Sequence, residues 1–586
     1  MVHWPCVSWK PTRHKMKNKN RFVLLVIVII GFVLRFYRLS DFPPSLNWDE
    51  ISHGYNAYSI LKTGADEWGV RFPLIFRAFG DYKLPAYIYL TTLPVLAFGL
   101  NAFAVRFISA LAGVLAIPLI YLLTNKLFSP VSSRVCSRDL EDSSTTVGMT
   151  SAGHKITAGH IAAFLLALSP WHFFFSRAAL EANLSLALII AGAYFLLSGP
   201  LNTKYYLLAT FFLSLSLHAY NAARVFVPLL IVAFALIYRR RIKFGPSLLF
   251  GAIILILSLS LVAYQFKTGE ATARYAKLAI INSATTFQIG QDRLASGLPT
   301  LVSRLIYNRP VFFTKKFTLN YFSYFTPTFF NQTRDVQTQF AIPNQNLFTY
   351  PVYLLAIIGF FIQLTRIKNE SSAKFILAWL LIAPIAAAAT IDPPQAIRPS
   401  LLMIPVILLA VSALIWLSKR FGSVVIWLSI ILTGVFFAQY LYQYFYIYPV
   451  KYSPSWQYGY EQVIKYVLDH KNEYDRIFIT KKYGEPHIFY SFFSKLDPKI
   501  IQFPTSSTRF TQADWFWTDR IENVYFVNDW LISTTDALNL KLESGEQVST
   551  KRSLLVTSFD NIPTNTSRIK TINFLDGSPA FVIVKF

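Results

Sequence analysis

The sequence has 586 residues, of which 54% are hydrophobic and only 15% are charged. A soluble globular domain usually carries about 25% charged residues, so this composition excludes an ordinary soluble protein and indicates a polytopic membrane protein. The net charge of +25 would favour a nucleic-acid partner in a soluble chain. Here the basic residues gather between long apolar runs, as in the loops of membrane proteins, and this distribution argues against nucleic acid.

The chain begins with a basic segment, residues 1–20, followed by the apolar run FVLLVIVIIGFVL. No small-residue cleavage pattern follows this run, so we expect an uncleaved anchor with a cytoplasmic N-terminus. About 20 apolar residues cross the hydrocarbon as a helix, and basic clusters mark the cytoplasmic side. On these rules the sequence predicts about eleven transmembrane helices: 21–39, 107–127, 160–175, 184–201, 205–220, 225–238, 248–266, 347–364, 375–390, 401–417 and 424–446.

The basic clusters RRRIK, RIK and KR end the spans predicted at 225–238, 347–364 and 401–417, and they place those ends in the cytoplasm. The same threading puts the large loops 35–106 and 267–346 outside. Within the first loop, PAYIYLTTLPVLAFGL (85–100) is apolar but short and is broken by Pro94. We therefore expect a helix that lies on the membrane surface or re-enters it.

The C-terminal part, residues 449–586, is less apolar. YGYEQVIKYVLDH has helical spacing, and RIFIT, NVYFVND, SLLVTS and AFVIVKF have the β-branched composition of short strands. No Gly-rich phosphate loop or metal-spaced Cys/His set occurs in this sequence segment. The predicted fold class is therefore an all-α polytopic domain, residues 21–448, with a small extracytoplasmic α/β domain, in the plasma membrane.

The stretch SLNWDEISHGYN (45–56) places two carboxylates at the membrane edge. Asn47 could be a helix N-cap, with Glu50 reaching back to it from the third helical position. In a second interpretation Asp49 is a functional group. The two interpretations are compatible, because a capped helix is a rigid support for Asp49.

The same external loop also carries Asp81 and Lys83, and further polar residues fall in other external turns: Arg177 and Glu181; His218, Asn221 and Arg224; and Asp392 and Arg398. Each has a structural alternative. Arg177 and Glu181, four apart, could form a simple ion pair, and an arginine at a span end could extend to the interface. Together they suit one chemistry, in which a carboxylate takes a proton from a hydroxyl while cations stabilise a departing phosphate. A lipid-borne phosphate would explain a site at the membrane surface.

Several segments carry a family resemblance. RFYRLSDFPPSLNWDE, SPWHFFFSRAALEANLSLAL and AIRPSLLMIPVILLAV resemble, in that order, parts of the GT-C glycosyltransferases of the protein O-mannosyltransferase-like family (glycosyltransferase family 39-like). That family includes the lipid A aminoarabinose transferase. The resemblance covers roughly residues 20–450. The familiar acid-Lys-Pro pattern is altered here to Asp81-Tyr-Lys-Leu-Pro.

The resemblance implies transfer of a sugar, with inversion, from a polyprenyl-phosphate donor to an acceptor hydroxyl on the extracytoplasmic face. It implies Asp49 as the base or as the group that orients the acceptor, with Glu50 supporting it. The residues it suggests for the donor phosphate are Lys83, Arg177, Arg224 and Arg398. Some relatives use a divalent metal, and Asp81, Glu181 and His53 are the candidates for a metal or substrate. No other cofactor is implied.

The acceptor, whether protein, lipid or glycan, is open at this stage. A transporter or flippase of lipid-linked glycans is an alternative, although its ionisable groups would be expected within the spans, which are here nearly free of charge. A surface-glycan polymerase or ligase shares the multi-span layout and is the other alternative.

Overall fold

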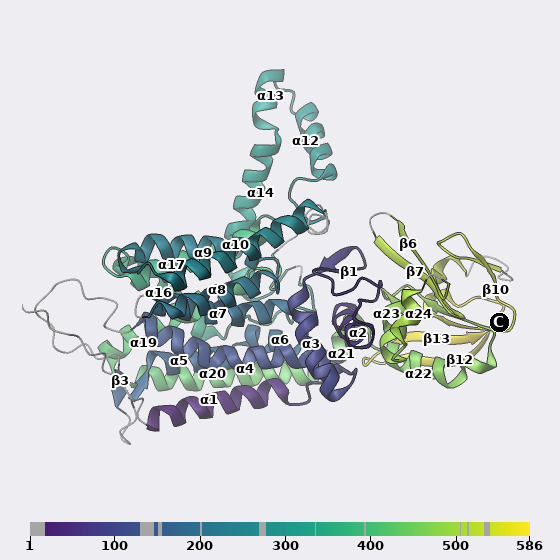
Figure 1. Cartoon of the computed structure of the whole chain (residues 1–586), viewed down its shortest axis with the longest axis horizontal. Coiled ribbons are helices and arrows are strands. Elements are labelled where there is room, and N and C mark those ends of the chain that lie inside the picture. The colour runs from purple at the N-terminus through teal and green to yellow at the C-terminus, as the bar shows by residue number, and fades with distance from the viewer. Residues whose placement is uncertain are drawn as a thin grey trace, which may run out of the picture.

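The structure is a computed structural model that describes residues 18–128, 146–149, 155–199, 202–268, 277–334, 336–391, 394–503, 505–512, 515–532 and 539–586. Long helices lie side by side in a bundle, and a domain built on a β-sheet lies at one end of it (Figure 1). The candidate functional residues of the sequence fall mostly in the segments between these two parts, so their junction is the region of interest.

The bundle consists of helices that coincide with the apolar runs of the sequence. They are α1 (Asn18–Phe36), α4 (Ala102–Leu127), α5 (Ala158–Ala167), α6 (Pro170–Arg177), α7 (Glu181–Ser198), α8 (Lys204–Leu217), α9 (Ala223–Tyr238), α10 (Pro246–Lys267), α16 (Tyr350–Arg366), α17 (Ser371–Ile382), α18 (Ile385–Ala388), α19 (Met403–Phe421) and α20 (Val424–Tyr442). Two short strands, β3 (Thr146–Met149) and β4 (Lys155–Thr157), precede α5.

Each predicted span contains a helix, but not every helix could cross a membrane alone. Among the described residues, six helices are long and apolar enough, or seven if a bent pair counts as one span. The chain is thus an integral membrane protein, while the count of about eleven spans is not confirmed. The segment expected as one span at 160–175 is that pair, α5 and α6, bent by 57°. The bend precedes Pro170, whose ring disfavours helical conformation in the residue before it.

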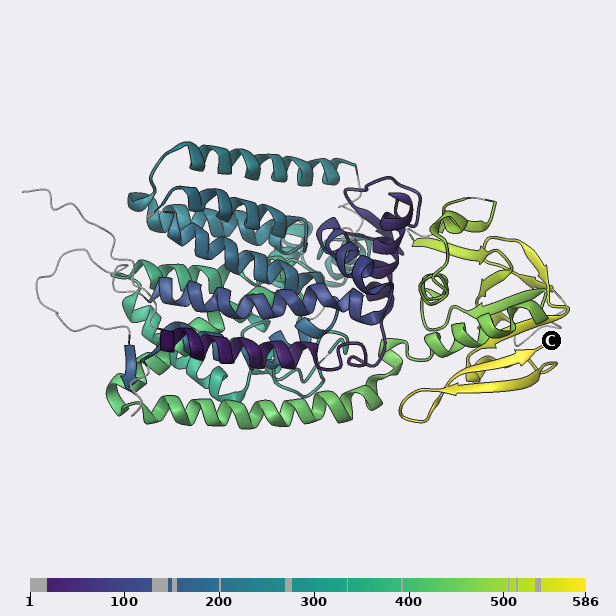
Figure 2. The same ribbon diagram turned by 60° about the horizontal axis from the view of Figure 1, so that its bottom comes forward.

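The basic clusters lie at the end of the bundle away from the sheet domain. The connection from α9 to α10, which carries Arg239–Arg241, lies at that end in both ribbon views (Figures 1 and 2). Figure 2 also places the turn between α19 and α20, which follows Arg420, at this end. The sheet domain and the basic clusters therefore occupy opposite ends of the bundle. Which end faces the cytoplasm stays a prediction from the positive-inside rule.

The first large loop forms α2 (Trp48–Thr63), the hairpin β1 (Phe76–Ala78) and β2 (Asp81–Lys83), and α3 (Pro85–Phe98). Fourteen residues make α3 about 21 Å long, shorter than the roughly 30 Å hydrocarbon core. The second large loop forms α12 (Ser283–Ala295), α13 (Thr300–Ile306), α14 (Arg309–Ser323) and α15 (Pro327–Phe330). In Figure 1, α12, α13 and α14 project away from the bundle as an arm.

The C-terminal domain is built on a seven-stranded sheet of order β12-β13-β11-β5-β8-β7-β6, in which β11, β5 and β8 are parallel. Its strands are β5 (Arg476–Thr480), β6 (Ser507–Gln512), β7 (Trp515–Ile521), β8 (Val524–Val527), β11 (Ser553–Thr557), β12 (Ser567–Asn573) and β13 (Pro579–Lys585), with a separate pair, β9 (Asn539–Lys541) and β10 (Gln547–Ser549). Its helices are α22 (Tyr460–His470), α23 (Pro486–Phe493) and α24 (Pro498–Gln502). The four strands and the helix expected from the sequence are confirmed.

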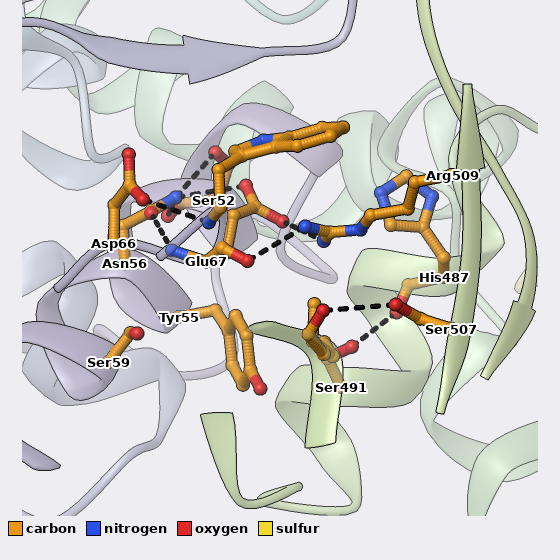
Figure 3. Close-up of polar contacts among 12 residues, drawn as sticks. Ser52, Tyr55, Asn56, Ser59, Asp66, Glu67, His487, Ser491, Ser507 and Arg509 are labelled. Atoms are coloured by element: carbon orange, nitrogen blue, oxygen red, sulfur yellow. Dashed lines mark hydrogen bonds and ion pairs between the residues drawn. The ribbon is translucent and has the colours of Figure 1, made fainter. Parts of the chain in front are cut away.

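A buried polar network fixes the sheet domain to the first loop (Figure 3). Arg509 on β6 donates from Nη1 to the carbonyl of Glu67 at 2.8 Å, and its Nη2 lies 3.4 Å from Glu67 Oε2. The Asn56 side chain bonds both the backbone N–H and the carboxylate of Glu67. Arg509 also stacks on Trp68, 4.0 Å from the ring centroid. Burial raises the pKa of Glu67 to about 6, although Arg509 opposes that shift.

Candidate functional site

A cavity of about 470 Å³ lies at the junction of the bundle and the sheet domain. Its walls come from the start of α2, the β1–β2 hairpin, the start of α7, and Trp515 on β7. Connecting segments complete it, at residues 219–221, 277–278, 337–340 and 395–398. Segments more than 400 residues apart in the sequence therefore meet at one space, and most of the charged residues proposed from the sequence lie around it.

Asp49 reaches this cavity because α2 begins immediately before it. Asn47 caps the helix: its side chain accepts a hydrogen bond from Glu50 N–H, and the Glu50 carboxylate accepts one from Asn47 N–H. This reciprocal pattern is the capping box expected from the sequence, which is therefore confirmed. It fixes the first turn of α2, and so fixes the backbone of Asp49.

Lys83, from β2, is paired with Asp49. Its Nζ lies 2.5 Å from Asp49 Oδ1 and 3.5 Å from the Asp49 carbonyl oxygen. The side chain of Lys83 is only 8% exposed, whereas that of Asp49 is 51% exposed. The pair thus presents a carboxylate to the cavity and keeps the ammonium largely behind it.

Glu50 has different surroundings from its neighbour Asp49. Its side chain is 1% exposed and accepts two hydrogen bonds from Arg106, at 2.9 and 3.0 Å. A third donor is the backbone N–H of Ala179, 2.8 Å from Oε1. Arg106, on α4, also donates to backbone carbonyls of the segment 39–45. Glu50 and Arg106 therefore tie α2, α4 and the segment before α7 together.

Glu181 and His53 form a second pair beside the cavity. Glu181 Oε1 lies 3.4 Å from His53 Nε2, and the His53 side chain is fully buried against Tyr87. Asp81 also lines the cavity. Within the described part of the chain, no group of three or more His, Cys, Asp or Glu side chains is arranged to hold a metal ion. The residues considered from the sequence as metal ligands therefore form no three-ligand set.

Two cations besides Lys83 line the cavity. Arg398 donates from Nη1 to Thr390 Oγ1 at 2.6 Å, and Lys277 donates from Nζ to the Gly80 carbonyl at 2.5 Å. Lys277 also lies over the Trp515 ring, 5.1 Å from its centroid. Lys277 was not predicted from the sequence, because a single lysine within a long loop carries no local signal of its position.

Arg177 and Arg224, proposed for the donor phosphate, lie outside this cavity. Arg177 is fully buried, and its guanidinium donates to five backbone carbonyls between residues 34 and 42 and to the Tyr444 hydroxyl. Arg224 donates to Gln265 Oε1 at 2.5 Å and to the Leu217 carbonyl. Arg177 and Glu181 do not lie on one helix, since α6 ends at Arg177 and α7 begins at Glu181, so their spacing of four residues does not place them on a common helical face.

His218, Asn221 and Asp392 were the remaining polar residues of the external turns. Asn221 lines the cavity, whereas the His218 ring lies 2.8 Å from Ser258 Oγ between two helices of the bundle. Asp392 lies outside the described residues. The hairpin turn at Gly80 explains how the cavity closes: a Cβ there would lie 2.2 Å from the Trp515 ring, so a side chain would push the sheet domain away.

No protein-family model and no curated protein sequence matches this chain. Several solved structures match it, and those with the higher TM-scores have the GT-C fold, so the fold recognised from the sequence is confirmed. ArnT from Cupriavidus metallidurans bound to undecaprenyl phosphate gives a TM-score of 0.51 at 12% identity, over 96% of this chain and 97% of that chain. The apo state of the same protein gives 0.50 at 11% identity, over 96% and 98%.

The apo oligosaccharyltransferase of Archaeoglobus fulgidus gives a lower TM-score of 0.45 at 12% identity. The match covers 82% of this chain and 64% of that chain, so this protein spans less than two thirds of the length of that oligosaccharyltransferase. At such identities, likeness shows the fold and not the activity.

Proposed function

We propose that this protein is a membrane glycosyltransferase that moves a sugar from a polyprenyl-phosphate donor to an acceptor hydroxyl, with inversion. The observation that carries the proposal is the half-exposed Asp49 carboxylate, held by Lys83 in a cavity that Lys277 and Arg398 also line. The shared fold with ArnT, which has been solved bound to undecaprenyl phosphate, supports a lipid-phosphate donor. The extracytoplasmic face is proposed on the positive-inside rule.

In the proposed reaction Asp49 accepts the proton of the acceptor hydroxyl. The hydroxyl oxygen forms a bond to the anomeric carbon of the donor sugar while the bond from that carbon to the phosphate oxygen breaks. The electron pair of the broken bond leaves with the polyprenyl phosphate. Attack opposite to the leaving group inverts the anomeric centre.

The cations have separate roles in this proposal. Lys277 and Arg398 are assigned to the charge that develops on the departing phosphate, because both cations line the cavity that Asp49 faces. Lys83 positions Asp49 and adds positive charge behind it. Arg177, Arg224 and Glu50 are left out, because their side chains are engaged with the protein scaffold.

The test is to incubate the purified protein with a panel of polyprenyl-phosphate sugars and to measure released polyprenyl phosphate. Release that depends on Asp49 supports the proposal. Movement of the intact donor across vesicles without release would favour a flippase instead, and no release from any donor in the panel would count against transferase activity.

A further inference from the structure

A second cavity, of about 500 Å³, adjoins the first on the side of the sheet domain. The two cavities share two wall residues, Trp48 and Trp515. The second cavity is also lined by Trp517 and Trp530, so four of the protein's 12 tryptophans surround it. Its volume falls within the roughly 300–1,000 Å³ range that is usual for small-molecule sites.

The indole rings are held in place by neighbouring groups. Trp515 and Trp517 are two apart on β7, so their side chains leave the strand on the same face, and their ring centroids are 5.9 Å apart. Trp515 Nε1 donates to Glu485 Oε1 at 2.6 Å. Lys481 lies 5.0 Å from the Trp517 centroid and is itself fixed by Asp519, with an Nζ–Oδ1 distance of 2.5 Å.

Trp48 is fixed equally closely. Its backbone N–H donates to Gln457 Oε1 at 2.8 Å, and Gln457 Nε2 donates to the Tyr483 carbonyl at 2.5 Å. Gly484 has a φ of +108°, and a Cβ there would lie 2.3 Å from the Trp48 ring. A glycine is therefore required for this approach. Because the rings are already held in place, a bound ligand loses less affinity to the ordering of these side chains.

Trp530 differs from the other three, because 46% of its surface is exposed at the edge of the cavity. Polar side chains also line this cavity: Gln339, Asn528, Lys482 and Glu543. A lining that combines flat aromatic side chains with amides and charged groups matches the chemistry of a sugar ring, which offers C–H groups on its faces and hydroxyls around its edge.

We propose that this four-tryptophan cavity binds a carbohydrate part of the acceptor, so that the acceptor is a glycan or a glycolipid headgroup. The assignment to the acceptor rests on the proposed function, whereas sugar binding itself does not. Trp48 lines both cavities and Asp49 lines the first, so a sugar bound in the second cavity against Trp48 would adjoin the space that Asp49 faces.

The test is saturation-transfer NMR on the full-length protein in detergent with cellobiose, maltose, mannobiose and di-N-acetylchitobiose as probes. We expect saturable binding of at least one disaccharide. Trp530→Ala should weaken it at least about tenfold, as removal of an anchoring aromatic does at binding sites, and Trp530→Phe should retain part of it. Trp416→Ala is the matched control, because Trp416 is similarly exposed, at 42%, on α19 and lies outside the cavity.

Absence of saturable binding to all four probes, or equal binding by wild type and Trp530→Ala, would overturn the proposal. Asp49→Asn separates it from the proposed function. That variant should bind the disaccharide as wild type does while it loses donor turnover. Sugar binding without any donor turnover in the wild type would contradict the transferase proposal and leave the sugar-site proposal supported. Donor turnover without Trp530-dependent sugar binding would support the transferase proposal and contradict the sugar site.

Discussion

Lys83 Nζ lies 2.5 Å from Asp49 Oδ1, so the proposed base forms an ion pair with a lysine that the sequence had suggested for the donor phosphate. The lysine is almost buried, and the carboxylate is half exposed at the cavity. A substrate therefore meets Asp49 first, and Lys83 acts on the substrate mainly through the orientation and charge of that carboxylate. This asymmetry supports the proposed roles of Asp49 as base and of Lys83 as a positioning residue.

Replacing Asp49 by Asn should lower kcat by about 10²- to 10⁴-fold, the usual contribution of a general base. The amide keeps the shape of the side chain but cannot take a proton. Turnover of a polyprenyl-phosphate sugar at matched folding is the measurement. Asp41→Asn serves as control, because Asp41 pairs with Arg38 at 2.7 Å outside the cavity. Equal turnover by the Asp49 variant and wild type would contradict the assignment.

Lys277→Gln and Arg398→Gln should each lower kcat/KM for the donor by about 10- to 100-fold. A hydrogen bond to a charged group contributes roughly 1.5–3 kcal/mol, and the phosphate gains charge as it leaves. Arg224→Gln provides the contrast, since Arg224 bonds Gln265 rather than facing the cavity. The measurement is kcat/KM for the donor in the three variants. A loss confined to Arg224→Gln would contradict the prediction and return Arg224 to the phosphate site.

Glu50→Gln should destabilise the protein and leave turnover per folded molecule nearly unchanged. The substitution leaves Arg106 buried with an unpaired charge, which typically costs about 3–5 kcal/mol. Thermal unfolding in detergent measures the effect. The double variant Glu50→Gln with Arg106→Gln should recover part of the loss, because neither charge then stays alone. Full thermal stability with abolished turnover would instead give Glu50 a role in the reaction.

Cysteine labelling should place Ser567 and Asn369 on opposite sides of the membrane. Both residues are exposed, Ser567 on β12 and Asn369 in the turn after α16 that follows a basic cluster. In a variant with Cys6 and Cys136 replaced by Ser, Ser567→Cys should react with an impermeant maleimide added to whole cells, and Asn369→Cys only after permeabilisation. The reverse pattern would invert the topology proposed from the positive-inside rule.

The free energy of unfolding should fall as the pH rises from about 4.5 to about 7, because Glu485 loses its proton over this range. Burial raises the pKa of Glu485 to about 7 from 4.5, so the folded state holds the proton more tightly than the unfolded chain. The stabilising contribution is complete below pH 4.5 and is lost as the pH rises through 7. Glu485→Gln should flatten this part of the profile, since glutamine can still accept the hydrogen bond from Trp515.

Melting temperature between pH 4.5 and 8 measures this dependence. Glu67 titrates in the same direction, because burial raises its pKa to about 6, so the difference between wild type and Glu485→Gln isolates the one residue. An identical slope in both proteins would show that Glu485 is not titrating in this range.

Local patterns in the sequence predicted local structure well. The capping box at Asn47 and Glu50 lies within one helical turn, and RIFIT and SLLVT correspond residue for residue to β5 and β11. Such features depend on neighbours in the chain, so the sequence contains the interacting residues side by side. The apolar runs likewise predicted the helices of the bundle. Several of these helices are apolar but too short to cross a membrane, so fewer helices than predicted spans meet the length requirement among the described residues.

Long-range partners could not be predicted in the same way. Arg106 pairs with Glu50 across 56 residues, and Trp515 reaches the cavity from more than 430 residues after Gly80. For Arg177, the sequence suggested a substrate contact that the structure does not contain. A cation at the end of an apolar run has the same sequence pattern whether it faces a substrate or, as here, a set of backbone carbonyls. Only the packing of α6 against the segment after α1 distinguishes the two.

The helical segment from Val424 to Tyr452 runs along the bundle and on toward the sheet domain without a gap (Figure 2). It comprises α20, a π-helical turn at Gln443–Ile447 and α21 (Tyr448–Tyr452). Each residue of a helix advances the chain by about 1.5 Å and turns it by about 100°. One residue inserted or deleted there would therefore tend to turn the sheet domain relative to the bundle, against the contacts of Arg509 with Glu67. The length of this rod must agree with those contacts for Trp515 to reach the wall of the cavity that Asp49 lines.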